Sequence, residues 1–217
     1  MSLERQSLVD YPESDGRPMG ETDLHRAAMV RHIELLSHHY QGQRVYVTGD
    51  LLVYYEEGNP KRFVVPDAFV AKGIAPGPRR TYLIWAEGKA PDLVIETTSR
   101  KTKRKDTLIK PALYAQLGIP EYFLFDPEGD YLDERLQGYR LESGRYVPMQ
   151  PGAEGRLISR ELNLRLCVEN DTLQFYRVGT NERLLTAAER AHRDRMACRE
   201  AEAEVLRLRA ELRRLQS

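Results

Sequence analysis

The chain has 217 residues, which is enough for one hydrophobic core with an appended segment. Hydrophobic residues make up 41% and charged residues 30%, as is typical of a folded, water-soluble protein. Its 33 basic and 33 acidic residues balance, so the net charge does not by itself indicate a nucleic-acid-binding protein.

The first predicted elements are an irregular lead-in over residues 1–21, where prolines and glycines alternate, and a helix that begins at Thr22. Gly42 is the expected end of this helix. Its predicted buried stripe follows helical spacing and consists of Met29, Ile33, Leu36 and Tyr40. Histidines recur beside this stripe every seven residues. They lie too far apart to share one ion, so we expect them on the helix surface or partly packed (His25, His32 and His39).

Strand-like segments follow the helix and predict a mixed α/β core. The first two, 44–48 and 51–55, are expected to form a hairpin around Gly49-Asp50. A third segment spans 63–70, a Gly- and Pro-rich loop spans 73–80, and a nearly continuous apolar strand spans 92–98. That apolar run fits a strand covered on both faces.

A second helix is predicted from Asp106, as its cap, to Leu117, with Gly118 as its stop. Pro111 removes one hydrogen bond, so this helix must start late or kink. A strand is expected at 121–125. Four short candidate strands follow, at 138–142, 145–148, 164–168 and 172–176. They predict an antiparallel β extension packed on the core.

The last segment, 181–217, changes character, because small and apolar residues recur in steps of three and four among Glu, Arg and Ala. This heptad pattern predicts a coiled coil, and its 32 positions would span roughly 48 Å. We expect a homodimer or higher homo-oligomer through this helix. The alternative is a helix laid on its own domain. The pattern consists of Leu184, Ala187, Ala191, Asp194, Cys198, Ala201, Val205, Leu208, Leu212 and Leu215.

Cysteine usage and apolar runs bear on the compartment. Cys167 and Cys198 are too few for a disulfide scaffold or zinc site, which fits a reducing cytoplasm. The first residues lack the apolar stretch of a signal peptide, and no apolar run approaches the length of a membrane span. We therefore expect a cytoplasmic protein without a membrane partner.

Two acidic residues stand in strand-like apolar runs, Asp67 in 63–70 and Glu96 in 92–98. Burying an unpaired charge is costly, so each needs a partner. Two carboxylates about 4 Å apart repel by roughly 4 kcal/mol at an effective dielectric near 20. Either one carboxylate stays protonated, or a cation between them offsets the repulsion. Mg²⁺ is the oxygen-loving ion that binds one or two carboxylates together with waters and phosphate oxygens. The sequence therefore predicts a metal site that handles phosphate.

Basic residues follow Glu96 closely. Residues 100–110 hold six cations and one anion, which fits contact with a phosphate backbone, although a solvated loop is the alternative. Lys110, near the start of the second helix, could reach back to the acidic pair. The predicted backbone contacts are Arg100, Lys101, Lys103, Arg104 and Lys105.

These residues resemble the PD-(D/E)XK nuclease superfamily and, within it, the Uma-two type of restriction endonuclease-like proteins. The resemblance covers roughly residues 22–180, where Lys110 stands four residues before Tyr114. Four stretches carry it: Asp50-Leu51-Leu52-Val53-Tyr54-Tyr55-Glu56-Glu57-Gly58-Asn59-Pro60, Val65-Pro66-Asp67, Leu93-Val94-Ile95-Glu96-Thr97-Thr98-Ser99, and Gly118-Ile119-Pro120-Glu121-Tyr122-Phe123-Leu124-Phe125-Asp126-Pro127. The resemblance implies a restriction-endonuclease-like mixed sheet core with flanking helices. It also implies DNA cleavage that depends on Mg²⁺ or Mn²⁺.

The resemblance also assigns roles by position. It implies that Asp67 and Glu96 are metal ligands, and that a lysine normally stands two residues after the second acid. Thr98 occupies that place here, so Lys110 is predicted to supply the lysine from the helix. Glu34 and Asp92 are possible extra acids, each with a surface role as the alternative.

Three hypotheses follow from this sequence. The first is a Mg-dependent endodeoxyribonuclease that uses a metal-activated water. The second is a catalytically weak nuclease-fold module that binds DNA or a partner and assembles through the coiled coil, and Thr98 motivates it. The third is a coiled-coil assembly protein whose globular part is passive. The expected organisation is a lead-in (1–21), a nuclease-like domain (22–180) and a C-terminal coiled-coil helix (181–217).

Overall fold

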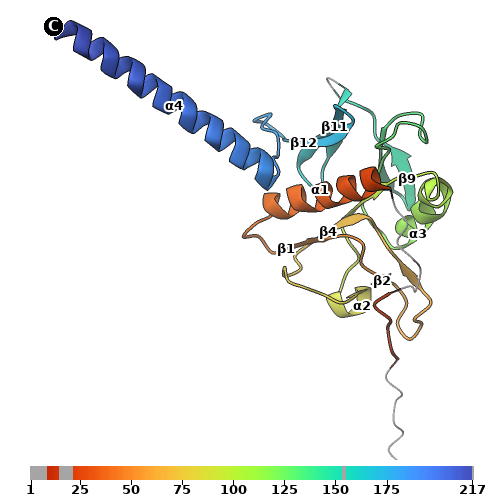
Figure 1. The fold of residues 1–217 in the computed structure, drawn as a ribbon. Coiled ribbons are helices and arrows are strands. Elements are labelled where there is room, and N and C mark those ends of the chain that lie inside the picture. The colour runs from red at the N-terminus through yellow and green to blue at the C-terminus, as the bar shows by residue number, and fades with distance from the viewer. Residues whose placement is uncertain (1–8, 15–21, 153–154, 217) are drawn as a thin grey trace, which may run out of the picture. The chain divides into compact units, whose positions relative to one another are not determined.

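The computed structural model describes residues 9–14, 22–152 and 155–216 (Figure 1). The chain forms two compact units, Met1–Leu184 and Leu185–Ser217. Most of the predicted lead-in lies outside the described residues. Its described part, 9–14, contains no helix or strand. It contacts β-strand residue Tyr54 of the same unit, whose hydroxyl donates to the Pro12 carbonyl at 2.6 Å.

A six-stranded mixed sheet is the centre of the larger unit. Its strand order is β1-β4-β6-β7-β8-β9, and only the β6–β7 pair is parallel. Parallel neighbours need a crossover connection, and the helix α3 (Lys110–Gln116) provides it. The strands are β1 (Val45–Thr48), β4 (Ala68–Lys72), β6 (Leu93–Thr97), β7 (Glu121–Phe125), β8 (Leu136–Glu142) and β9 (Arg145–Pro148).

One face of this sheet is covered by α1 (Asp23–His39) and by a small antiparallel sheet (Figure 1). The Thr22 side chain caps α1 by accepting a hydrogen bond from the His25 amide at 3.2 Å. Leu35 and Leu36 of α1 pack in the same buried cluster as Leu93 and Ile95 of β6. The small sheet consists of β10 (Leu157–Ser159), β11 (Leu164–Glu169) and β12 (Thr172–Arg177).

The opposite face is covered by α3, by α2 (Ile84–Glu87) and by a third, short sheet. Val94 of β6 packs here with Tyr114 of α3, because successive side chains along a strand point to opposite faces. A π-helical turn, η1 (Lys105–Ile109), leads directly into α3. The short sheet consists of β2 (Val53–Tyr54), β3 (Phe63–Val64) and β5 (Tyr82–Leu83).

The structure confirms the mixed α/β class and the double-sided burial of the apolar strand, because all five residues of β6 are buried. The antiparallel extension divides in two. Strands β8 and β9 continue the main sheet, whereas β11 and β12 form the small sheet together with β10, which the sequence did not predict.

Two local predictions are wrong. Gly49-Asp50 does not form a hairpin turn, because β1 pairs with β4 whereas β2 pairs with β3 and β5. The segment 63–70 is not one strand either. It is interrupted at Pro66-Asp67, where Pro66 has no amide to donate to a ladder and its carbonyl accepts from the Asp50 amide at 2.9 Å.

The smaller unit contains one long helix, α4 (Ala187–Leu215). Thr186 begins it with a capping box, in which the Thr186 side chain accepts from the Glu189 amide and the Glu189 carboxylate accepts from the Thr186 amide. None of the residues Ala187–Leu215 of α4 is buried, and the heptad positions Val205, Leu208 and Leu212 are exposed. Among the described helices, none has an apolar stretch long enough to cross a membrane.

Candidate active site

Asp67 and Glu96 lie side by side at one edge of the main sheet. Ala68 of β4 pairs with Ile95 of the antiparallel strand β6, so the residue before Ala68 meets the residue after Ile95. The Asp67 amide donates to Glu96 Oε2 at 3.2 Å, and the Thr97 amide donates to Asp67 Oδ2 at 2.7 Å. These two contacts fix both carboxylates relative to the backbone of the neighbouring strand.

Lys110 joins this pair from the first residue of α3. Its Nζ lies 2.8 Å from Glu96 Oε2 and 3.1 Å from Asp106 Oδ1, and it donates to the Val65 carbonyl at 3.4 Å. The Lys110 side chain is 15% exposed. The structure therefore brings together the three predicted catalytic residues, with the cation supplied by the helix.

The two acids sit in different environments. Burial is the largest influence on Glu96 and raises its pKa to about 8. The Asp67 and Asp106 charges raise it further, against the opposing charge of Lys110. Burial would also raise the pKa of Asp67, but the hydrogen bond from His25 and the Lys110 charge outweigh it and hold that pKa below its usual value. Opposite shifts in neighbouring acids are frequent at functional sites.

His25 belongs to this site, although it was expected on the helix surface or partly packed. It is 2% exposed, and its Nε2 lies 3.3 Å from Asp67 Oδ2. His32 is fully buried seven residues later against Phe125 and Phe175, and burial lowers its pKa to about 3. Both histidines share a helical face with the buried Leu36, a spacing visible in the sequence.

Asp106 and Thr98 also belong to this site, although the sequence pattern predicts no role in it for either side chain. Asp106 was predicted to cap the second helix, but it lies inside η1, is 1% exposed, and makes no capping bond. Its Oδ2 accepts from the Thr98 hydroxyl at 3.0 Å. Tyr114 adds a third contact to Glu96, because its hydroxyl donates to Oε1 at 2.5 Å.

The predicted backbone-binding residues follow β6 directly, at the same edge of the sheet. All five side chains are exposed, and they lead into the π-helical turn that precedes Lys110. Cations placed beside an acidic pair can hold a phosphate chain near it. These residues are Arg100, Lys101, Lys103, Arg104 and Lys105.

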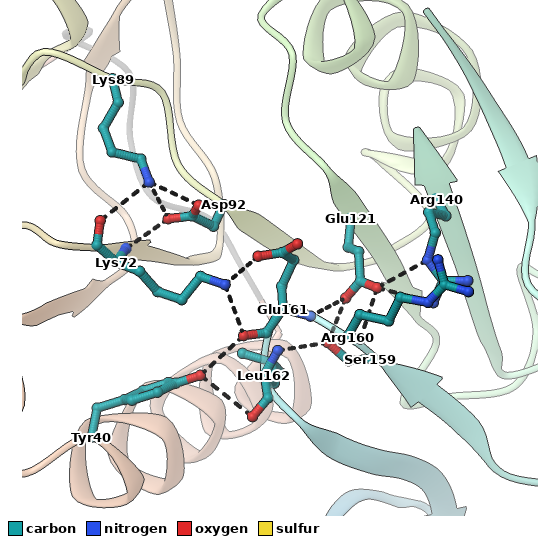
Figure 2. A network of polar contacts seen from close by, with 10 residues as sticks. All are labelled: Tyr40, Lys72, Lys89, Asp92, Glu121, Arg140, Ser159, Arg160, Glu161 and Leu162. Atoms are coloured by element: carbon teal, nitrogen blue, oxygen red, sulfur yellow. Dashed lines mark hydrogen bonds and ion pairs between the residues drawn. The ribbon is translucent and has the colours of Figure 1, made fainter. Parts of the chain in front are cut away.

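The two possible extra acids lie elsewhere. Asp92 is at the opposite end of β6, about 13 Å of strand from Glu96, where it accepts from the Lys72 amide at 2.6 Å and pairs with Lys89 at 2.7 Å (Figure 2). Glu34 lies about 13 Å of helix beyond His25, the α1 residue that contacts Asp67. Asp92 therefore stabilises a local turn, and α1 brings a histidine to the acidic pair.

The residues fit a hard divalent cation in part. No group of three or more His, Cys, Asp or Glu side chains arranged to bind a metal occurs within the described residues. Mg²⁺, however, is commonly held by only one or two carboxylates. Asp67 and Glu96 can supply these, and the buried negative charge of three carboxylates near Lys110 favours an added cation. The two oxygens of the Glu96 carboxylate already accept three contacts. A carboxylate can accept about four, so Glu96 keeps capacity for one further contact, such as one to a metal ion.

Comparisons with known proteins agree with the resemblance seen in the sequence. The model of the Uma2 family, described as "Putative restriction endonuclease", matches residues 3–171. A solved structure from Anabaena variabilis ATCC 29413, described as "a putative nuclease belonging to DUF820", is 17% identical, with a TM-score of 0.48. The match covers 67% of this chain and 76% of that one. No curated protein matches the chain.

Proposed function

We propose that this chain, which belongs to the Uma2 family of restriction endonuclease-like proteins, is a metal-dependent DNA endonuclease that hydrolyses phosphodiester bonds. The family match supports a nuclease function in general. The observation that carries the finer proposal is the convergence of Asp67, Glu96 and Lys110 at the sheet edge that the exposed basic segment follows.

Each residue has a separate role in this proposal. Asp67 and Glu96 would hold Mg²⁺ or Mn²⁺ through their carboxylate oxygens. Such an ion, when bound, lowers the pKa of a water and stabilises charge on the phosphoryl group. Lys110, held 2.8 Å from Glu96, would orient the attacking water or a phosphate oxygen and offset the charge that develops in the transition state.

The basic segment 100–105 would hold the DNA backbone without reading its sequence. Its five cations are exposed and continue directly from β6, so a phosphate contacting them lies close to the end of the strand that carries Glu96. Binding through this segment should weaken as salt increases, because each phosphate contact releases counterions.

The proposal is tested by incubating supercoiled plasmid with the full-length protein in Mg²⁺ or Mn²⁺ and measuring nicking. Asp67→Asn and Glu96→Gln should each remove nearly all nicking while the far-ultraviolet circular dichroism stays unchanged. Asp92→Asn is a matched control, because it removes a carboxylate from the far end of the same strand. Nicking at the wild-type rate in Glu96→Gln would contradict the proposal.

A second candidate function is a nuclease-fold module that binds DNA or a partner protein with little catalysis. It is favoured by the three contacts that already engage the Glu96 carboxylate. Calorimetric titration with Mn²⁺ separates the two candidates when it is combined with the nicking assay. Metal and DNA binding without nicking would favour the module.

We also propose that the chain forms a homodimer or higher homo-oligomer through α4, since the spacing of Ala201, Val205, Leu208, Leu212 and Leu215 is that of a heptad. The double variant Leu208→Glu/Leu212→Glu should reduce the mass measured by light scattering. Leu206→Glu is the matched control, because Leu206 is exposed outside the heptad positions. If the assembly variant keeps its fold and its nicking activity, the globular unit is not passive.

A further inference from the structure

A chain of polar contacts leads from the end of β6 to Lys110. The Thr98 hydroxyl donates to Asp106 Oδ2 at 3.0 Å, and Asp106 Oδ1 lies 3.1 Å from Lys110 Nζ, which in turn lies 2.8 Å from Glu96 Oε2. Thr98 and Asp106 are each 1% exposed. Buried polar side chains that bond to one another in series restrict each other's orientation.

The backbone around Asp106 explains why its side chain faces inward. The Lys110 amide donates to the Lys105 carbonyl, five residues back, instead of following the four-residue spacing of an α-helix. This wider turn directly precedes Pro111, whose ring would clash with the preceding turn of a regular helix. The Tyr122 hydroxyl of β7 donates to the Asp106 carbonyl at 2.7 Å and ties the turn to the sheet.

The charge of Asp106 has one close cation within the described residues, Lys110. A buried carboxylate needs such a partner, because its desolvation is otherwise uncompensated. Lysine carries a point charge on a flexible stem, so the contact with Glu96 and the longer one to the Val65 carbonyl by themselves fix its ammonium poorly. Asp106 supplies a second carboxylate contact to the ammonium, and Thr98 holds Asp106 in the rotamer that reaches Lys110.

We infer that Asp106 and Thr98 are positioning residues that hold the Lys110 ammonium beside Glu96 for phosphodiester cleavage. This inference rests on the proposed function. Thr98 lies two residues after Glu96 and therefore on the same face of the strand. Strand β6 and the residue directly after it then both contribute to the site, through the carboxylate of Glu96 and through the Thr98 hydroxyl that orients Asp106.

The first test is a double-mutant cycle on the full chain with plasmid nicking as the readout. Asp106→Asn should lower kcat by about 10- to 100-fold and change the KM for DNA by less than about twofold, as expected for a residue that orients a catalytic group. Lys110→Met should lower kcat further. If Asp106 acts through Lys110, the double variant is as slow as Lys110→Met alone. A double variant that is slower by the full Asp106→Asn factor would overturn the inference.

The hydroxyl of Thr98 is tested by a conservative pair. Thr98→Val keeps the shape but removes the donor, and Thr98→Ser keeps the donor, so Ser should recover most of the rate that Val loses. Thr107→Val is the matched control in the same π-helical turn, because the Thr107 hydroxyl donates to the Lys103 carbonyl instead. Equal rates for the Val and Ser variants would contradict a role for the hydroxyl.

A measurement without DNA distinguishes failure of this inference from failure of the proposed function. In protein labelled with ¹⁵N-lysine, an ammonium held by two carboxylates should give a side-chain signal protected from solvent exchange, assigned by its loss in Lys110→Met. We expect Asp106→Asn to broaden or remove it. A signal that is unchanged in Asp106→Asn overturns the inference even if the protein cleaves DNA. A wild type that does not cleave but shows the expected loss contradicts the proposed function alone.

Discussion

Glu96 and Glu121 are buried glutamates on the adjacent parallel strands β6 and β7, and they differ in how their charge is compensated. Glu121 accepts from the Ser159 hydroxyl, from the amides of Arg160 and Glu161, and from Arg140 at 3.1 Å (Figure 2). These donors tie the loop before β11 to the main sheet. Glu121 therefore has a structural role that its neighbours fully explain.

Glu96 lies in a cluster with excess negative charge. Glu96 and Asp106 both contact Lys110, and the charges of Asp67 and Asp106 both act on Glu96, with His25 beside Asp67. Burial of an acid in an apolar strand therefore does not by itself indicate a functional site. The useful signal is a buried carboxylate whose neighbours add like charge, because only an added cation or proton then balances it.

The largest expected effect is structural and concerns the satisfied glutamate. Glu121→Ala removes the acceptor for one hydroxyl, two amides and Arg140, and should lower the free energy of unfolding by about 3 kcal/mol. Urea denaturation measures this change. Nicking per folded molecule should stay at the wild-type level, and a loss of nicking at full folding would break the distinction between the two glutamates.

The complementary prediction concerns activity. Glu96→Gln should reduce the nicking rate by about 10²-fold or more, because it replaces one of the two proposed ligands of the ion that would stabilise transition-state charge. Its unfolding free energy should not fall as that of Glu121→Ala does, because the neutral amide relieves repulsion by Asp67 and Asp106. Kinetics and urea denaturation of the same preparation test both statements.

The pH dependence of stability should separate the glutamates further. The pKa of Glu96 is raised from 4.5 to about 8, so the metal-free folded protein binds a proton there that the unfolded chain has released. The contribution of Glu96 to the free energy of unfolding is therefore greatest below about pH 4.5. It falls as the pH rises towards 8. Scanning calorimetry should show a Tm that falls by a few degrees over this range in wild type. Glu96→Gln should show a smaller fall, and an unchanged profile would contradict the assignment.

A smaller effect is expected from His25, which links α1 to the acidic cluster. His25→Ala removes the partner 3.3 Å from Asp67 and should lower kcat about 10-fold, the lower end of the range for outer partners of a site. His38→Ala, on the exposed face of the same helix, is the control. Equal activity of both variants would contradict a role of His25 in cleavage.

The smallest effect concerns the exposed basic segment. Arg104→Ala and Lys105→Ala should each weaken DNA binding at low salt and reduce the slope of log Kd against log salt by about one. Fluorescence anisotropy at several salt concentrations measures this slope. If the variant that carries both substitutions keeps the wild-type slope, these two cations do not contact the DNA backbone.

Local patterns in the sequence were sufficient to predict much of the fold. The residues of α1 follow helical spacing from the Thr22 cap, and β6 and β7 are short apolar runs bounded by turn residues, so their positions depend mainly on neighbours in the chain. The same patterns singled out Asp67, Glu96 and Lys110, which the structure brings together. Their roles as metal ligands and catalytic lysine stay predictions.

Contacts between distant residues decided the rest. The pairing of β1 with β4, the burial of His25 beside Asp67, and the donors around Glu121 each join segments far apart in the sequence. Asp92 and Glu96 occupy one strand, yet only packing shows that Asp92 serves a turn while Glu96 faces Lys110. The sequence shows which side chains carry charge. Whether a buried charge is balanced depends on which groups the folded chain places around it, and that is a property of the tertiary structure.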